Sequence, residues 1–297
     1  MVLEGLRSLF GMDPPGMRRA SVRCANPLGL HRIAWTEWGD EDNPDVLVCV
    51  HGLTRNARDF DDLARALASE FRVVCPDVAG RGRSDWLPNP AFYALPQYVS
   101  DMIVLIARLG VEHVHWLGTS LGGLIGMLLA AQKDSPISRL VLNDVGPVLS
   151  AAAIKRIGDY VGRAPKFADY AAAEAYIRTI SAPFGPLTDA QWQHLTESSL
   201  RAVDGGGYEI IYDPAIAMAF AATPAANVEL WPLYDAIRCP TLVVRGAESD
   251  LLARDTFDTM AQRGPRAKLL EIAGVGHAPM LLDEQQIAPV RAFLMEN

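Results

Sequence analysis

The sequence predicts an α/β fold, in which a mostly parallel sheet of eight strands carries helices on both faces. Continuous apolar runs, typical of strands buried on both faces, recur along the chain, and segments with apolar residues at helical spacing lie between them. This alternation is typical of parallel sheets, because a parallel connection needs a crossover that is usually a helix. In addition, the interval 147–233 breaks the rhythm and is predicted to form several helices.

The elements are predicted in order along the chain. The first two strands, 20–25 and 30–39, form an antiparallel pair, because apolar and polar residues alternate within the second of them. The remaining strands are predicted at 45–52, 71–77, 114–118, 139–144, 240–246 and 267–274. Helices are predicted at 59–70, 96–110 and 121–134, and the last of these is apolar on almost every side.

The predicted domain organisation is one core interrupted by an insertion. The first part of the core spans 1–146, a helical cap spans 147–233, and the second part of the core spans 234–297. Because the strands on both sides belong to one sheet pattern, an inserted cap is favoured over a separate small domain. Such an insertion lies at the carboxyl ends of the strands, where ligands bind in open α/β sheets.

The N-terminal arm, 1–19, is predicted to include a short amphipathic helix that lies on its own domain; contact with a partner or a membrane is the alternative. Its apolar part contains charged residues, so it is a poor match to a signal peptide. The chain contains no apolar run of the length that a membrane span needs.

Composition narrows the function classes. Half of the 297 residues are hydrophobic and 21% are charged, enough for a sizeable core. A net charge of −8 without a basic cluster argues against binding to nucleic acid. The four cysteines lack zinc-site spacing, so no metal is expected, and free thiols in a reducing, cytoplasmic compartment fit them best.

The stretch Gly118–Thr119–Ser120–Leu121–Gly122 lies between a predicted strand and a predicted helix. A reversal this tight forces its central residue into a strained conformation and exposes that side chain, as in the G-x-S-x-G nucleophile elbow. The sequence therefore predicts that Ser120 is a nucleophile; a plain Gly/Ser turn is the alternative.

A serine nucleophile needs a base, and the base needs an acid that orients it. His277 is the predicted base, because it lies in a glycine-bracketed loop after the last strand. Asp250, after the strand 240–246, is the preferred acid. Asp144, directly after the strand 139–143, is the alternative, and Glu248 and Asp255 are less well placed.

From about residue 20 to 297 the chain resembles the α/β-hydrolase superfamily, in its serine-nucleophile, helical-cap form. The resemblance rests on HGLT at 51–54, DVAGRGRS at 77–84, the elbow and GVGHAP at 274–279. It implies a triad of Ser120, Asp250 and His277, with an oxyanion hole formed by the backbone N–H groups of Leu53 and Leu121. Asp250 follows Gly246 by four residues where the commonest family spacing is three, so Asp144 stays open as the acid.

The resemblance implies hydrolysis of a carboxylic ester or lactone through an acyl-enzyme, without a cofactor. The expected substrate is a small or medium ester, including the hydroxyalkanoate type, and Arg55 and Thr119 are candidate substrate-binding residues. A carbon–carbon hydrolase of ring-fission diketones is the alternative, although that group favours asparagine where this chain has Thr119. The remaining interpretations are a perhydrolase and a non-catalytic binding protein. A homodimer is possible from the sequence.

Overall fold

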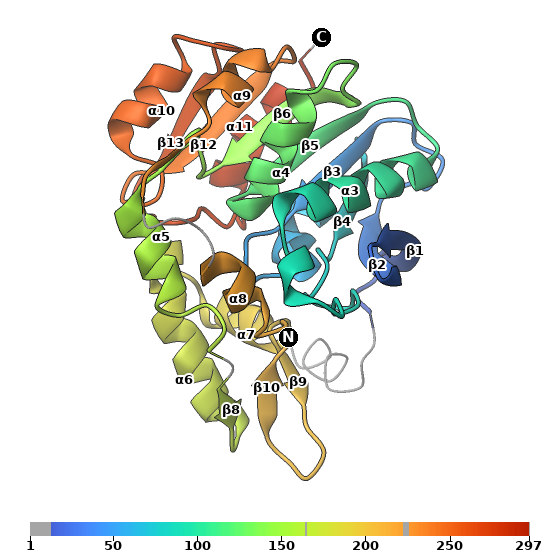
Figure 1. Ribbon diagram of the computed structural model, residues 1–297, viewed down its shortest axis with the longest axis vertical. Coiled ribbons are helices and arrows are strands. Elements are labelled where there is room, and N and C mark those ends of the chain that lie inside the picture. Colours follow the sequence, from blue (N-terminus) through green and yellow to red (C-terminus); the bar gives the residue numbers. More distant parts are fainter. Residues whose placement is uncertain (1–12, 164, 222–225, 297) are drawn as a thin grey trace.

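A computed structural model describes residues 13–163, 165–221 and 226–296 (Figure 1). The predicted N-terminal helix falls in the part of the chain outside these ranges. Within them, no helix combines the length and the apolar character that crossing a membrane requires.

The core is an eight-stranded sheet in the order β1-β2-β4-β3-β5-β6-β12-β13. β1 pairs antiparallel with β2, and β2 pairs antiparallel with β4, whereas the other neighbours are parallel. The strands are β1 (Arg18–Asn26), β2 (Gly29–Trp38), β3 (Val46–Val50), β4 (Arg72–Pro76), β5 (Val114–Thr119), β6 (Ile137–Asn143), β12 (Thr241–Gly246) and β13 (Lys268–Ile272). The prediction of a mostly parallel, eight-stranded sheet is confirmed, with the antiparallel pairs at one edge.

Helices cover both faces of this sheet (Figure 1). One face carries α3 (Leu95–Leu109), α4 (Leu121–Ala130), α9 (Trp231–Ala236) and α10 (Arg254–Met260). The other carries α2 (Asp61–Leu67), which continues from the short helix η1 (Ala57–Phe60), and α11 (Glu284–Leu294). The central strands contribute buried side chains to both helix-covered layers, because successive side chains of a strand point to opposite faces of the sheet.

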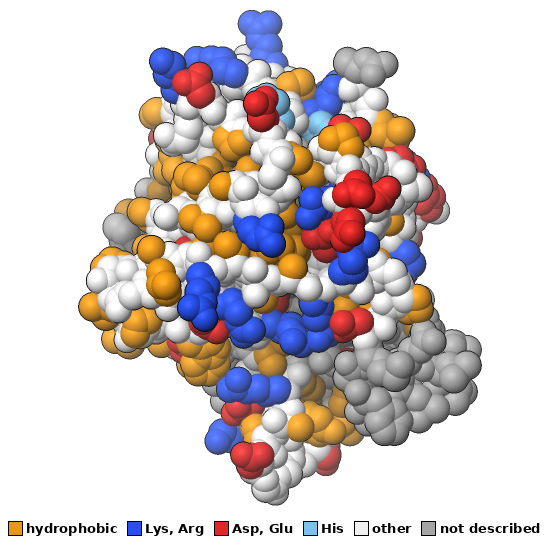
Figure 2. All heavy atoms as spheres, turned by 90° about the vertical axis from the view of Figure 1, so that its right-hand side faces the viewer, with side chains coloured by type: hydrophobic (Ala, Val, Ile, Leu, Met, Phe, Trp, Pro, Cys, Tyr) orange, Lys and Arg blue, Asp and Glu red, His pale blue; other side chains and the backbone are white. Residues whose placement is uncertain are grey.

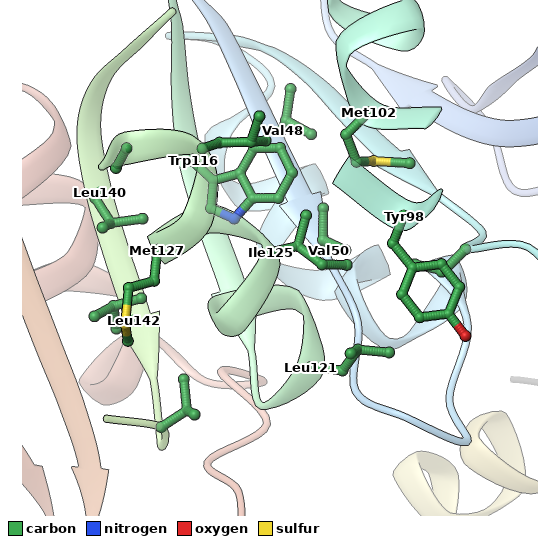
Figure 3. Packing of buried hydrophobic residues seen from close by; sticks show 14 of the residues in the cluster. Val48, Val50, Tyr98, Met102, Trp116, Leu121, Ile125, Met127, Leu140 and Leu142 are labelled. Carbon is green, nitrogen blue, oxygen red and sulfur yellow. The ribbon is translucent and has the colours of Figure 1, made fainter. Parts of the chain in front are cut away.

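The layer that holds α4 is packed around Trp116 of β5. Figure 3 shows its indole among the side chains of Val48, Ile125 and Leu140, and all four residues are fully buried. The indole N–H is satisfied inside this core, since it donates to the carbonyl of Gly122 at 3.0 Å. The first turn of α4 is therefore anchored directly to the strand that precedes it.

The inserted segment that the sequence predicts, 147–233, follows β6, and most of it projects from one side of the sheet (Figure 1), whereas its last residues, 231–233, begin α9 on the core. The helices that project from the sheet are α5 (Ala151–Gly158), α6 (Tyr170–Ile180), η3 (Ala182–Phe184), α7 (Asp189–Glu197) and α8 (Ile216–Ala221). A further short helix, η2 (Pro90–Phe92), precedes α3 in the core. The inserted segment also contains the short strands β7 (Val148–Leu149), β8 (Lys166–Phe167), β9 (Leu200–Ala202), β10 (Tyr208–Ile210) and β11 (Val228–Glu229). Sequence analysis did not predict these strands, because two or three residues are too few to show a periodicity.

The inserted segment contacts loops that follow the carboxyl ends of several core strands. The side chain of Asn56, after β3, donates to the carbonyl of Ser198 at 2.8 Å, and the backbone N–H of Gly82, after β4, donates to Ile211 at 3.1 Å. After β13, the N–H of Gly276 donates to the carbonyl of Pro183 at 2.7 Å. These contacts place the segment over the edge of the sheet at which Ser120 lies.

Candidate active site

Ser120 lies in the tight turn between β5, which ends at Thr119, and α4, which begins at Leu121. Its backbone has φ 52° and ψ −112°, a strained conformation for a residue with a Cβ. The turn closes only because its flanks are glycines. A Cβ on Gly118 would lie 2.2 Å from the backbone of Gly122, and a Cβ on Gly122 would lie 2.0 Å from the carbonyl oxygen of Val50.

The side chain of His277 connects Ser120 to Asp144. Nε2 of His277 lies 3.0 Å from the hydroxyl of Ser120, and Nδ1 lies 2.7 Å from Oδ2 of Asp144. A carboxylate accepts only, so Nδ1 carries the proton and Nε2 is left to accept from the serine hydroxyl. This is the arrangement in which a histidine can act as a general base toward serine.

Asp144 follows the last residue of β6 directly and is fully buried. The backbone N–H of Gly246 donates to its Oδ1 at 2.9 Å, and the hydroxyl of Ser249 donates to its Oδ2 at 2.7 Å. Together with His277 these groups give the carboxylate three donors, which fixes its plane and direction. A buried carboxylate held in this way can orient an imidazole and stabilise it when it is charged.

The preference for Asp250 as the partner of His277 is corrected by this geometry. The side chain of Asp250 is 53% exposed and forms an ion pair with Arg156 of α5. The loop after β12 instead turns Ser249 inward, so Asp250 faces away from the histidine. Asp144, the alternative from the sequence, is the carboxylate that the structure brings to His277.

The loop after β3 brings a backbone amide to the serine. A Cβ on Gly52 would lie 3.7 Å from Cβ of Ser120, so the peptide that joins Gly52 to Leu53 borders the nucleophile. Its carbonyl accepts from Nδ1 of His51 at 2.7 Å and from the N–H of Arg55 at 3.2 Å. Since a trans peptide directs its N–H opposite to its carbonyl, these bonds also fix the N–H of Leu53. Leu121, the second predicted donor, is the first residue of α4, where N–H groups have no acceptor within the helix.

His51 is a residue whose role sequence analysis did not identify. Its ring is fully buried, and Nε2 accepts from the N–H of Val78 at 3.0 Å. Burial lowers the pKa of His51 to about 3, so the ring stays neutral. The sequence feature that could have indicated the role of His51 is a histidine directly before a glycine at the end of a buried strand.

A comparison with known protein families covers the three residues that are joined by hydrogen bonds at this site, Ser120, His277 and Asp144. The sequence pattern of the family described as "alpha/beta hydrolase fold" matches residues 45–284, which include Ser120, Asp144 and His277. This chain belongs to the alpha/beta hydrolase family. Its sequence is 52% identical to a 3-hydroxybutyrate-oligomer hydrolase from Cupriavidus necator over 284 residues, 93% of this chain and 97% of the relative.

Other relatives of this hydrolase are more distant. It is 25% identical over 233 residues to a 2-(acetamidomethylene)succinate hydrolase from Mesorhizobium japonicum, covering 78% of this chain and 81% of that protein. The crystal structure of an alpha/beta hydrolase from Novosphingobium aromaticivorans superposes with a TM-score of 0.84 at 38% identity, over 95% of this chain and 99% of that one.

In this hydrolase the DVAGRGRS stretch supports the loop after β3. Arg81 is fully buried and donates from Nε to the carbonyl of Leu53 at 2.8 Å and from Nη1 to the hydroxyl of Tyr98 at 2.8 Å. Asp77 accepts from the backbone N–H groups of Ala57 and Arg83 at 2.8 and 2.9 Å. Burial raises the pKa of Asp77 to about 6.

The two candidate substrate-binding residues are both engaged within the protein. Arg55 binds Asp59 through Nε and Nη2 and donates from Nη1 to the hydroxyl of Ser199 at 2.8 Å. The hydroxyl of Thr119 accepts from the amide of Asn143 at 2.9 Å. The polar groups of both side chains therefore hold elements of the hydrolase together.

One buried group among the described residues combines metal-ligating side chains. The ligand atoms of Cys24, His31 and Asp101 lie within 4.8 Å of one another, at the antiparallel edge of the sheet. Both ring nitrogens of His31 already have partners, since Nε2 lies 3.0 Å from Asp101 and Nδ1 lies 3.1 Å from the amide of Asn26. Hydrogen bonds within the protein account for this cluster.

Basic side chains gather on the face beside β1 and β2, where they form a band across the molecule (Figure 2). A cleft of about 400 Å³ there is lined by Arg32, Gly82, Arg83, Ser84, Asp85, Trp86 and Arg201. Arg32 lies 3.5 Å from Asp85, and Arg201 lies 2.7 Å from Glu209. The lining of this cleft includes none of Ser120, Asp144 and His277.

Proposed function

We propose that this chain is a serine esterase in which Ser120 is the nucleophile, His277 the general base and Asp144 the orienting acid. The observation that carries the proposal is the continuous line of hydrogen bonds from the hydroxyl of Ser120 through His277 to Asp144. The strained backbone of Ser120 supports it further, because such strain concentrates at functional sites.

In the proposed reaction, Oγ of Ser120 attacks the ester carbonyl carbon while Nε2 of His277 takes the hydroxyl proton. The N–H groups of Leu53 and Leu121 meet the negative charge that develops on the carbonyl oxygen. When the tetrahedral intermediate collapses, the histidine returns the proton to the leaving alcohol. Water then releases the acyl group from Ser120 by the same steps, and Asp144 stabilises the charged imidazole each time.

The proposed substrates are short oligomers of 3-hydroxyalkanoic acids, whose ester bonds join the hydroxyl of one unit to the carboxyl of the next. Support comes from the 52% identity to the hydrolase of 3-hydroxybutyrate oligomers, which extends over 93% of this chain. We propose that the inserted segment acts as a cap over the site. Its contacts with Asn56, Gly82 and Gly276, in the loops around the catalytic edge, support this role.

A cytoplasmic location is also proposed. All four cysteines are free thiols: Cys24, Cys49 and Cys75 are buried and Cys239 is half-buried. Unpaired thiols are typical of proteins from reducing compartments.

A fluorophosphonate probe tests the nucleophile, because it forms a covalent bond only with an activated serine. We expect the wild-type protein to be labelled and Ser120→Ala, its matched control, to remain unlabelled. Equal labelling of the two proteins would overturn the assignment of Ser120. Absence of labelling in both would favour a binding protein without catalysis.

The substrate class is tested by incubating the enzyme with dimers and trimers of 3-hydroxybutyrate and measuring release of the monomer by chromatography. A series of p-nitrophenyl esters of increasing acyl length, and a ring-fission diketone, serve as comparisons. We expect turnover of the oligomers and of short acyl esters. Turnover of the diketone alone would support a carbon–carbon hydrolase instead, and activity confined to long acyl chains would contradict the proposed substrate size.

A further inference from the structure

We propose that the basic cleft between the core and the inserted segment binds the free carboxylate of the oligomer whose ester bond is cleaved at Ser120. The positive charge of this cleft comes from Arg32, Arg83 and Arg201. The inference rests on the proposed function, because an oligomer of a hydroxyalkanoic acid ends in a carboxyl group that is ionised at neutral pH. It adds a docking site for that end of the substrate.

The cleft lies on the seam between the core and the inserted segment. Arg32 belongs to β2 and Arg83 to the loop after β4, whereas Arg201 belongs to β9 of the inserted segment. The two sides are joined beside the cleft, since the backbone N–H of Gly82 donates to the carbonyl of Ile211 at 3.1 Å. A substrate reaches a site beneath a cap along such a seam, so a positive charge there acts on an anionic substrate as it enters.

Both walls of the cleft continue into residues that contact the loop after β3. On the core side, Arg81 adjoins the lining of the cleft in sequence and donates to the carbonyl of Leu53 at 2.8 Å. On the other side, Ser199 lies two residues before Arg201 and accepts from Nη1 of Arg55 at 2.8 Å. In the proposal, the units between the cleaved ester and the free carboxylate extend from this loop to the cleft.

The charge of the cleft is opposite to the charge of the whole chain. A net charge of −8 repels an anionic substrate at long range. The lining of the cleft instead carries three guanidinium groups against one carboxylate, that of Asp85, and basic side chains form a band on this face (Figure 2). The three arginines are far apart in the sequence, so they form no basic cluster there. Charge complementarity therefore favours an anion as the occupant.

The guanidinium groups keep N–H donors for an additional acceptor. Arg83 has no ion-pair partner in the described part of the chain. Arg201 is bonded to Glu209 through Nε at 2.7 Å, and Arg32 uses Nη2 for the carbonyl of residue 83 at 2.9 Å. Burial and the charge of Arg83 both lower the pKa of Arg19, so positive charges on this face lie close enough to repel one another. A bound carboxylate reduces this repulsion.

Trp86 provides the apolar part of the cleft. Its side chain is 43% exposed, and the guanidinium carbon of Arg201 lies 5.2 Å from the centre of its ring. The methyl and methylene groups of the terminal hydroxyalkanoate unit can cover this ring, and burial of apolar surface is favourable. A charged group beside an apolar one matches the end of such an oligomer better than it matches a simple inorganic anion.

The test compares a trimer of 3-hydroxybutyrate with the same trimer after its free carboxyl group is converted to the primary amide. The amide has the shape of the acid without its charge and introduces no further ester. Cleavage of the ester bonds is followed by chromatography for the wild type, Arg83→Gln, Arg201→Gln and Arg83→Gln/Arg201→Gln. For the acid we expect KM to rise about threefold in each single variant and about tenfold in the double variant, with kcat unchanged, because only uniform binding is lost. For the amide, KM should be the same in all four proteins.

Arg108→Gln is the matched control, because Arg108 is exposed at the end of α3, has the same charge and lies outside the lining of the cleft. It should keep the wild-type KM for both trimers. For the acid, the ratio of KM between Arg83→Gln and the wild type should fall as the ionic strength rises from about 0.01 M to about 0.15 M, since the Debye length shortens from about 30 to about 8 Å. Thermal unfolding checks that every variant is folded.

The outcomes separate this inference from the proposed function. If the wild type cleaves neither trimer, the proposed substrate class fails, and the docking site fails with it. If the wild type cleaves both and the double variant keeps the wild-type KM for the acid, or raises KM equally for acid and amide, the esterase stands and the docking site is overturned. An equal rise of KM in Arg108→Gln also overturns it, because the effect would then come from net charge alone.

Discussion

Asp144 and His277 lie 133 positions apart in the sequence, and a hydrogen bond of 2.7 Å joins their side chains. They meet because Asp144 follows β6 directly and His277 follows β13, and both strands end at the same edge of one parallel sheet. Between them lies β12, whose last residue, Gly246, donates its N–H to Asp144. Three strand ends thus converge on one carboxylate.

The first prediction compares the two aspartates considered for the triad. Asp144→Asn should lower kcat by about 10⁴-fold, because an amide at this position no longer holds His277 in the tautomer that accepts a proton from serine. Asp250→Asn should leave kcat within about twofold of the wild type and change the free energy of unfolding by at most about 1 kcal/mol, since an exposed ion pair contributes little.

Steady-state kinetics on a short ester checks this prediction, with thermal unfolding as the control for folding. A collapse of kcat in Asp250→Asn with normal activity in Asp144→Asn would reverse the assignment.

The sheet and the turn at Ser120 could be predicted from the sequence, whereas the choice of the carboxylate that contacts His277 could not. Short apolar runs between segments of helical spacing identify most of the strands, and Gly118 and Gly122 around Ser120 identify the turn, because each pattern has a local physical cause. No local pattern indicates which side chain of the loop after β12 faces inward. That choice depends on contacts with Asp144 and the first turn after Ser249. Asp250 was therefore preferred for its place in the loop after the strand 240–246, although its spacing from Gly246 did not match the commonest one.

Substitution of a glycine at the elbow should destabilise the fold. In Gly122→Ala the new Cβ would lie 2.0 Å from the carbonyl oxygen of Val50, which is backbone of a central strand and cannot move aside easily. We expect a loss of about 1–3 kcal/mol or more in the free energy of unfolding, measured in urea. Gly52→Ala is the control, because its nearest new contact is 3.7 Å. Equal stability of the two variants would show that the elbow accommodates a Cβ.

Substitution of Arg55 distinguishes a structural role of this residue from a role in binding substrate. Its side chain and that of Asp59 are 13% and 9% exposed and form a two-bond ion pair. Arg55→Met should cost about 3–5 kcal/mol of unfolding free energy, because it leaves a buried carboxylate unpaired. Arg55→Met/Asp59→Leu should be more stable than the single variant.

Urea unfolding of the two proteins measures this difference. If Arg55→Met keeps wild-type stability and raises only KM, then Arg55 binds substrate and its contact with Asp59 is unimportant for folding.

The buried His51 should make part of the stability dependent on pH. Its pKa is about 3 in the folded protein and about 6.5 in an unfolded chain, so between these values the unfolded chain binds the proton more readily. Acidification through this range therefore lowers the free energy of unfolding, and the same change has no such effect on His51→Gln, whose side chain does not titrate. From pH 7.5 to 5.0 the wild type should lose about 2 kcal/mol more than the variant in urea unfolding. Titrations common to both proteins, including that of Asp77, cancel in this difference. Parallel pH dependences would mean that the ring of His51 is protonated within the fold, and its hydrogen bond from Val78 would then be lost.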